Sequence, residues 1–544
     1  MSLNFQQFLN KHLRKLKYAI IPLGAFLAGA GMFGRYNPKA PDGILLNSIK
    51  FRDVLAHIEN DYVDFVDSDS LGDAAIISVL NKLDPHSKYL PGSQVNEDKT
   101  ALESQFGGVG CEFFQFQDTI RIENVSARSP AAKAGLEPGD ALLAVDKMDA
   151  VGLADPHKFL FKHVRGAEKS VVNFKVLKWG KTRPQDLKLT RQVIKSESVE
   201  AAYMLNAETG FLKISRFTAT TAPQVRTELQ LLIEEGAKQL ILDLRDNSGG
   251  YVHTAAKVAD EFLPAGELIV YTKGKNKKHD TKVYSTGYGI FEEQPLVVLV
   301  NENTASAAEI LAGTLQDNDR ALIVGRRTYG KGLVQVPVLL PDGSEMRLTV
   351  SRYFTPSGRC IQKNYARGRH AYFKEIASRN QNGELFYVDS MKQVDQNKYY
   401  TVTGRTVYGG GGIKPDIFTP KDTGACQSFF SHCRPDEAIK YAGVYVFQKN
   451  KHSLSKQHLK ARHIKVNDED LSPLWNWLDL QNQSANAADM SILAPELKKI
   501  VHAYAAKAME KQQGFVEILN QDDPELKQAG QALGKAACLL RDFH

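Results

Sequence analysis

Cysteine is scarce in this chain. Five of the 544 residues are cysteines, and no two of them form a Cys-x-x-Cys pair. A structural zinc site or a thioredoxin-type redox site is therefore not expected. One pairing stays open, because Cys426 and Cys433 are close enough in sequence to form a disulfide in an oxidising compartment.

A strong charge imbalance is also lacking. The net charge is +7, and the basic residues do not gather in one stripe, so the sequence does not favour nucleic-acid binding. Hydrophobic residues make up 43% of the chain and charged residues 24%, which is ordinary for soluble globular domains. The length predicts about three to four domains.

A long apolar run is missing as well. The apolar stretch 18–33 has 16 residues, whereas a membrane-spanning helix needs about 20. It follows the basic run 11–17, and this order is typical of a secretory signal or an uncleaved anchor. Ala28-Gly-Ala30 offers a cleavage site, so cleavage and anchoring both stay open. In either case residues 1–36 predict that the chain is exported.

Residues 37–100 are predicted to form a helical region. Apolar residues at helical spacing indicate one helix over about 46–63 and a second from Gly72 to Leu83. The proline-rich turn 84–91 closes the region. His86 lies in this turn, and we interpret it as a capping or turn histidine, not as a metal ligand or triad member.

Residues 101–193 are predicted to be β-rich. Strands are expected at 109–116, 119–125, 141–145, 171–177 and 186–191, with a helix at 156–164. The segment Phe106-Gly-Gly-Val-Gly-Cys-Glu-Phe113 places glycines before a strand, where successive N–H groups can converge on an anion. Gly108, Val109, Gly110 and Cys111 are therefore candidates for binding a peptide's C-terminal carboxylate, with the peptide adding as an edge strand.

Residues 194–422 show the order of an α/β domain, and residues 423–544 are mostly helical with Asp523 as the N-cap of a helix that begins at Pro524. In the α/β region a strand, a turn and a helix N-terminus follow one another twice, at Gly249-Gly250 and at Ser306. Helix N-termini supply backbone donors for an oxyanion, so we expect two loops to meet at one site. The helical segment carries no recognisable chemistry.

Ser306, Lys331 and Gln335 form the strongest catalytic candidate. A serine at a helix N-terminus suits a nucleophile, but it needs a base to take its proton. Lys331 can be that base if burial keeps its amine neutral, and Gln335 can orient the amine without adding charge. The more ordinary interpretation is an N-cap serine and a Gly-Lys-Gly turn.

Three other kinds of site fit the sequence poorly. Residues 325–331 begin like a phosphate-binding loop, but Gly332 replaces the magnesium-binding Ser/Thr, and a strand follows in place of a helix. His-Glu-x-x-His is absent, which excludes a zincin. Ser306 is not in Gly-x-Ser-x-Gly, which argues against a lipase-type triad.

Taken together, the motifs resemble those of the C-terminal processing peptidases, the tail-specific proteases of the S41 class. The resemblance covers about residues 45 to 420. It is carried by Leu83-Asp-Pro-His-Ser87, Ser129–Asp146, Asp243-Leu-Arg-Asp-Asn-Ser-Gly-Gly250, Thr304-Ala-Ser-Ala-Ala-Glu309, Tyr329-Gly-Lys-Gly332 with Gln335, Tyr353–Arg359 and Gly410-Gly-Gly-Ile-Lys-Pro-Asp416.

The resemblance implies roles for these residues. Ser306 would be the nucleophile, Lys331 the general base and Gln335 the residue that orients it, with an oxyanion hole from the N–H of Ala307 and that of Gly249 or Gly250. Ser248 departs from the family's usual proline but leaves both glycines in place. No metal and no cofactor is implied.

The resemblance also implies a fold and a function. The fold class is α+β multidomain: an N-terminal helical segment, a PDZ β-barrel-like domain, a crotonase-like (ββα) α/β peptidase core and a C-terminal helical domain. We expect an exported, periplasmic serine endopeptidase, free or tethered to the inner membrane, that binds apolar, unstructured C-termini. The resemblance does not extend to residues 423–544, whose role stays open between helical packing, adaptor binding and self-association. The alternatives are an inactive PDZ scaffold and an acyl-thioester enzyme on the related core.

Overall fold

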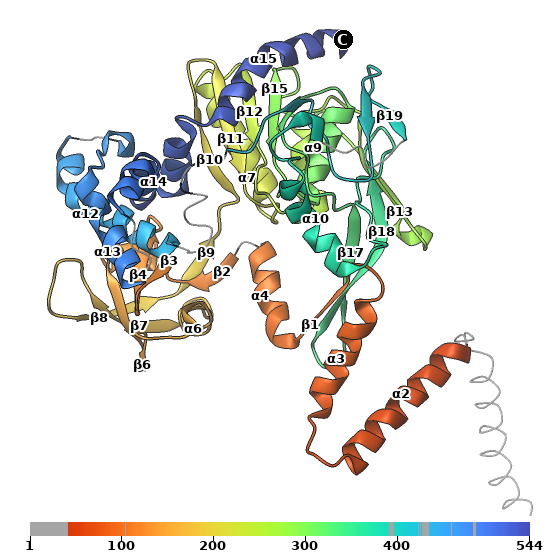
Figure 1. Ribbon diagram of the computed structural model, residues 1–544, viewed down its shortest axis with the longest axis horizontal. Helices are drawn as coiled ribbons and strands as arrows, with labels where there is room; N and C mark the ends of the chain where they lie inside the picture. The colour runs from red at the N-terminus through yellow and green to blue at the C-terminus, as the bar shows by residue number, and fades with distance from the viewer. Residues whose placement is uncertain are drawn as a thin grey trace, which may run out of the picture. The chain divides into compact units, whose positions relative to one another are not determined.

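The computed structural model describes most of the chain beyond residue 41 (Figure 1). The described residues are 42–543 except 104, 391–396, 423, 425, 427–434, 458–459 and 482–485. The predicted signal or anchor and Cys433 therefore lie outside them, while Cys426 is a free, buried thiol. The chain divides into two compact units, residues 1–79 and 80–544.

The first unit contains the two predicted helices with different bounds. They are α2 (Asp42–Asp61) and α3 (Ser68–Leu80). The prediction that the second helix runs from Gly72 to Leu83 is wrong at both ends. Asp67 accepts the Ser70 hydroxyl at 2.9 Å and so holds an earlier first turn. None of the helices among the described residues is long and apolar enough to cross a membrane.

The second unit begins with a β-rich region, residues 105–195. Its sheet has the order β3 (Cys111–Phe116), β4 (Thr119–Val125), β5 (Ala141–Val145), β7 (Val171–Leu177), β8 (Gln185–Thr190), with β6 (Met148–Asp149) on β5. β2 (Gln105–Gly108) pairs with β9 (Gln192–Lys195), and two short helices, α5 (Pro130–Lys133) and α6 (Pro156–His163), complete the region. The predicted continuous strand 109–116 is wrong, because Gly110 has φ 80° and a Cβ there would lie 2.3 Å from that of Ser129.

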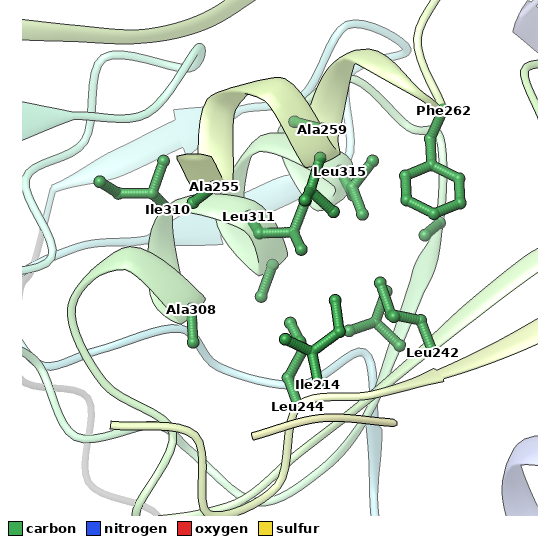
Figure 2. Close-up of a cluster of buried hydrophobic side chains, with 14 of the residues drawn as sticks. Ile214, Leu242, Leu244, Ala255, Ala259, Phe262, Ala308, Ile310, Leu311 and Leu315 are labelled. Carbon is green, nitrogen blue, oxygen red and sulfur yellow. The ribbon is translucent and has the colours of Figure 1, made fainter. Parts of the chain in front are cut away.

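A six-stranded, largely parallel sheet forms the centre of the second unit. Its order is β10 (Val199–Met204), β11 (Thr209–Ile214), β12 (Gln239–Asp243), β15 (Leu296–Val300), β16 (Leu322–Gly325), β21 (Ile417–Phe418). β15 is buried along its whole length, as expected for a parallel strand covered on both faces. One face packs on α7 (Thr221–Glu234), α8 (Val252–Asp260) and α9 (Ala307–Asp317). Figure 2 shows part of this core, with Leu311 and Leu315 of α9 near Leu242 of β12.

A second sheet supports the loops that follow. It has the order β1 (Lys88–Leu90), β18 (Glu345–Phe354), β13 (Leu268–Gly274), β14 (Thr281–Tyr284), with β17 (Leu333–Leu339) also on β18. The neighbouring helices are α4 (Gly92–Glu103) and α10 (Arg369–Gln381), and β19 (Lys398–Tyr400) pairs with β20 (Thr406–Tyr408). β1 thus joins the turn that contains His86 to the sheet that contains Gln335.

The helical tail, residues 435–543, has two attachments. Its helices are α12 (Asp436–Gln457), α13 (Ser472–Leu480), α14 (Ala487–Asn520) and α15 (Pro524–Phe543). The first three share a core with Phe114 and Phe116 of β3. α14 bends at Glu510 and Lys511, which have non-helical dihedrals. Beyond the bend, α15 packs on the other face of the parallel sheet, as Figure 1 shows beside β12 and β15. The architecture as a whole is mixed α/β.

Candidate active site

Ser306 lies between β15 and α9 with a strained backbone. Its φ is 56° and its ψ is −116°, a conformation that non-glycine residues rarely adopt. Its N–H donates to Glu309 Oε2 at 2.9 Å, so the third residue of the helix holds the residue that precedes it. This geometry presents the serine at the helix N-terminus, where backbone donors and the helix dipole favour negative charge.

Lys331 lies in the loop between β16 and β17, and its amine contacts Gln335. The Lys331 Nζ donates to Gln335 Oε1 at 3.3 Å. The Gln335 amide in turn donates to the His86 carbonyl oxygen. Burial, and next the charge of Lys88, lower the pKa of Lys331, although Glu309 and Asp84 oppose the shift. A lowered pKa favours the neutral amine that a general base requires.

One cavity brings the predicted residues together. It measures about 700 Å³ and is lined by Ser306, Lys331, Gln335 and residues 248–251, with α4 and β17 on its other sides. The loop after β12 reaches the serine directly: a Cβ on Gly249 would lie 2.8 Å from that of Ser306 and 2.9 Å from the Ala307 nitrogen. The two loops that the sequence predicts to meet are therefore in contact.

The two glycines differ in what their N–H groups do. Gly249 donates its N–H to Asn247 Oδ1 at 2.9 Å, so this donor is already engaged. Gly250 pairs with Phe217 in an isolated parallel bridge and also lines the cavity. The geometry therefore favours Gly250 over Gly249 as the partner of the Ala307 N–H, a choice that the sequence leaves open.

Two further residues, which the sequence does not predict to take part, hold the site together. The buried Glu309 carboxylate accepts N–H groups from Ser306 (2.9 Å), Lys331 (2.8 Å) and Gly330 (2.7 Å). The buried Tyr353 hydroxyl donates to the Ser306 carbonyl at 3.0 Å and also contacts the Lys331 carbonyl. Both side chains thus tie the serine loop to the lysine loop. Glu309 was detectable as the Ser-x-x-Glu capping pattern, whereas Tyr353 depends on sheet pairing.

His86 occupies a turn, as the sequence predicts, but it also lies next to the cavity. Its N–H donates to Asp84 Oδ1 at 2.8 Å, and its Nε2 lies 2.7 Å from the Tyr372 hydroxyl. Burial, and next the charge of Lys331, lower the pKa of His86 to about 3. The His86 imidazole is therefore neutral, and the backbone carbonyl of His86 accepts the Gln335 amide. Both features indicate that His86 has a structural role beside the lysine.

The four residues predicted to bind peptide lie at a separate place. Gly108, Val109, Gly110 and Cys111 line a cavity of about 760 Å³ in the β-rich region, opposite residues of α6 such as Leu160. The carbonyl groups of Val109 and Gly110 accept N–H groups from Ala131 and Ser126, both at 2.9 Å. The cavity lies between a strand edge and a helix, a position that suits an added peptide strand.

Comparisons with known proteins show the family of this chain. Residues 208–368 match the model of peptidase family S41. A carboxy-terminal-processing protease of Bartonella bacilliformis is 33% identical over 318 residues, which cover 58% of this chain and 72% of the relative. The chain belongs to peptidase family S41, among the carboxy-terminal processing proteases.

Further relatives of this S41 peptidase are also C-terminal processing proteases. A carboxyl-terminal-processing protease of Synechocystis sp. is 36% identical over 295 residues, 53% of this chain and 68% of the relative. Among solved structures, a photosystem II D1 C-terminal processing protease is 26% identical and covers 69% of this chain and 88% of its own, with a TM-score of 0.34.

Membership makes the protein a serine-type peptidase. The residues matched to the family, 208–368, include Ser306, Lys331 and Gln335. They also include Glu309 and Tyr353. The roles of individual side chains in this S41 peptidase stay predictions, and the geometry above is what supports them.

Proposed function

We propose that this S41 peptidase cleaves protein tails with a Ser306–Lys331 dyad. The observation that carries the proposal is one cavity that is lined by both a strained serine at a helix N-terminus and a half-buried lysine. Glu309 accepts backbone N–H groups from both residues and so joins their two loops.

The proposed reaction uses one proton carrier. Neutral Lys331 takes the proton from the Ser306 hydroxyl as its oxygen attacks the scissile carbonyl carbon. The N–H groups of Ala307 and Gly250 stabilise the resulting oxyanion. The Lys331 ammonium then protonates the leaving amine, and the acyl-enzyme remains. A water molecule, deprotonated by the same amine, hydrolyses that ester and restores the serine.

We further propose that residues 105–195 are a PDZ domain that binds the substrate's C-terminus. Support comes from the glycine-rich segment, which lines a cavity together with α6. An apolar, unstructured C-terminus would add beside this segment and deliver upstream residues to Ser306. The parallel sheet with α8 and α9 on one face is the part we assign to the crotonase-like core.

The same proposal includes the location and the partners of the protein. We propose that the chain is exported to the periplasm and associates with the membrane through residues 1–36. We also propose that the helical tail serves self-association or adaptor binding. Their support is the sequence pattern described above. Fractionation of cells that carry a C-terminally tagged protein tests export. Recovery of the tagged protein in the cytosol, with its leader intact, would contradict it.

A direct test uses a peptide with an apolar C-terminus and the Ser306→Ala variant. We expect the full chain to cut the peptide into two fragments and the variant to leave it intact, as read by mass spectrometry. The alternative, an inactive peptide-binding scaffold, predicts that both proteins bind the peptide and neither cuts it. Turnover of acyl-CoA esters but not of peptides would favour an acyl-thioester enzyme.

A further inference from the structure

The first turn of α15 contacts the roots of the catalytic loops. Asp523 caps the helix, since its Oδ1 accepts the Glu525 N–H at 2.8 Å and the Leu526 N–H at 3.3 Å. Its other oxygen, Oδ2, accepts Arg245 Nη1 at 2.6 Å. One carboxylate thus begins the helix and also binds an arginine of the peptidase core.

Glu525 lies between two arginines. Its Oε2 is 3.3 Å from Arg245 Nη1, and its Oε1 contacts Arg326 Nη1. The side chains of Arg326 and Glu525 are 6% and 9% exposed, so water screens this pair poorly. Burial alone would lower the pKa of Arg326, but the carboxylates of Glu525 and Glu302 outweigh it and raise that pKa.

Each arginine begins a loop of the active site. Arg245 follows β12 and directly precedes the glycine loop 246–250. Arg326 follows β16 and precedes the loop that ends at Lys331. Arg326 Nε also donates to Glu302 Oε2 at 2.7 Å, and Glu302 lies in the loop that ends at Ser306. All three loops are therefore joined through Arg245 and Arg326, each of which binds a carboxylate of the core (Asp243 or Glu302) as well as a carboxylate of the tail.

No other part of the tail reaches the catalytic loops in this way among the contacts of the described residues. α15 lies outside residues 208–368, which match the family model. Its apolar face, with Leu526 and Leu533, packs on Val297 and Leu299 of the sheet and supplies adhesion. Adhesion alone needs no buried carboxylates, since apolar burial is as stabilising as a buried ion pair.

We infer that Asp523 and Glu525 are positioning residues of the peptidase, which hold the glycine, serine and lysine loops in register through Arg245 and Arg326. The inference rests on the proposed Ser306–Lys331 function. Loss of the Glu525 carboxylate takes one partner from Arg326, which is buried, and one from Arg245, which is half-buried. We expect the starts of the two loops to shift as these arginines find other partners. A misplacement of about 1 Å at the reacting atoms lowers turnover about 100-fold.

The test compares Glu525→Gln with Leu533→Ala in the full chain. Glu525→Gln keeps the shape of the side chain and removes its charge. Leu533→Ala weakens the docking of the same helix without touching the arginines. We expect Glu525→Gln to lower kcat for peptide cleavage about 10- to 100-fold with KM unchanged, and Glu525→Asp to restore part of the loss. We expect Leu533→Ala to lower Tm at least as much as Glu525→Gln does and to leave kcat unchanged.

The possible outcomes separate this inference from the proposed function. An inactive wild-type chain contradicts the proposed function and not this inference. An active wild type with an equally active, folded Glu525→Gln variant overturns the inference, as does an equal loss of kcat in Leu533→Ala. If Glu525→Gln does not fold, Asp523→Asn decides by the same kcat and Tm measurements, because Asp523 binds only one of the two arginines and asparagine is also a good N-cap.

Discussion

At the scale of single residues, the proposed mechanism depends on the protonation state of Lys331. The lysine is half-buried, and its pKa is lowered first by desolvation and then by the charge of Lys88. The proposed mechanism needs the neutral amine, so it predicts that activity rises as the pH passes through this lowered pKa. The rise is therefore expected at a lower pH than for a free lysine, whose pKa is 10.5.

Replacement of Lys331 by methionine removes the base and also the burial penalty. We expect peptide cleavage to fall by about 100- to 10,000-fold. In the wild type the unfolded chain binds more protons between the lowered pKa and 10.5, so the free energy of unfolding rises with pH in that window. The Lys331→Met variant lacks this rise, and it is the more stable protein below the window.

Urea denaturation at several pH values measures the difference. The stability advantage of Lys331→Met should shrink as the pH approaches 10.5. An advantage that grows with pH would mean that burial does not depress the ionisation of Lys331 in the folded state.

Glu309 is the second residue with a specific prediction. Its two oxygens accept three backbone N–H groups and contact the Thr328 hydroxyl. Glu309→Gln replaces one acceptor by an amide donor, which leaves buried donors unpaired. We expect the free energy of unfolding to fall by about 2–4 kcal/mol.

The matched control for Glu309 is Glu234→Gln on α7. Glu234 is exposed, so Glu234→Gln should change the free energy of unfolding of the protein by less than about 0.5 kcal/mol. Equal stability of the two variants in urea would show that Glu309 does not join the serine and lysine loops.

At the scale of elements, the glycine loop and the start of α9 must approach closely. Gly249 has φ 98°, and a Cβ there would lie 2.8 Å from that of Ser306. We expect Gly249→Ala to displace the serine loop and lower kcat about 100- to 1,000-fold, the size of a lost oxyanion donor. The measurement is peptide cleavage together with fluorophosphonate labelling of Ser306.

The control is Gly266→Ala, before β13. Gly266 has φ 90°, but a Cβ there meets nothing within 4 Å. Gly266→Ala therefore introduces a similar backbone strain without a collision, and the activity of this variant should equal that of the wild type. A similar loss in both variants would trace the effect to stability and not to the approach of the two loops.

Local sequence patterns predicted the elements that carry chemistry. The apolar run before Ser306 and the Asp523-Pro524 cap are short-range signals, and both appear in the structure as expected. The split between β2 and β3 was missed because a positive φ at Gly110 is set by its neighbour Ser129. Tyr353 and Glu525 were missed because their partners lie far away in the chain, where periodicity carries no information.

At the scale of the whole second unit, the helical tail joins the β-rich region to the peptidase core. Tyr441 of α12 stacks on Phe116 of β3 with ring centroids 4.0 Å apart, and Arg121 lies 5.1 Å from the centre of the Tyr441 ring. Beyond the bend in α14, α15 lies on the parallel sheet. The tail thus links the proposed peptide-binding cavity to the catalytic loops.

Tyr441→Ala should loosen the first of these attachments. We expect the docking of α12 on β3 to weaken by about 2–4 kcal/mol, with faster hydrogen exchange at residues 111–125 and unchanged exchange in β15. Tyr445→Ala, one turn further along, is the control: Tyr445 is 36% exposed, and its ring lies edge-on to that of Trp179 with centroids 6.4 Å apart. Equal exchange in the two variants would contradict a specific role for the stacked pair.

The most direct measurement is the rate at which a fluorophosphonate labels Ser306 as a function of pH, in the wild type and in Lys331→Met. The account predicts that the wild-type rate rises through one ionisation below 10.5, and that the variant labels slowly at every pH. Equal labelling of the folded variant and the wild type would show that the lysine does not activate the serine.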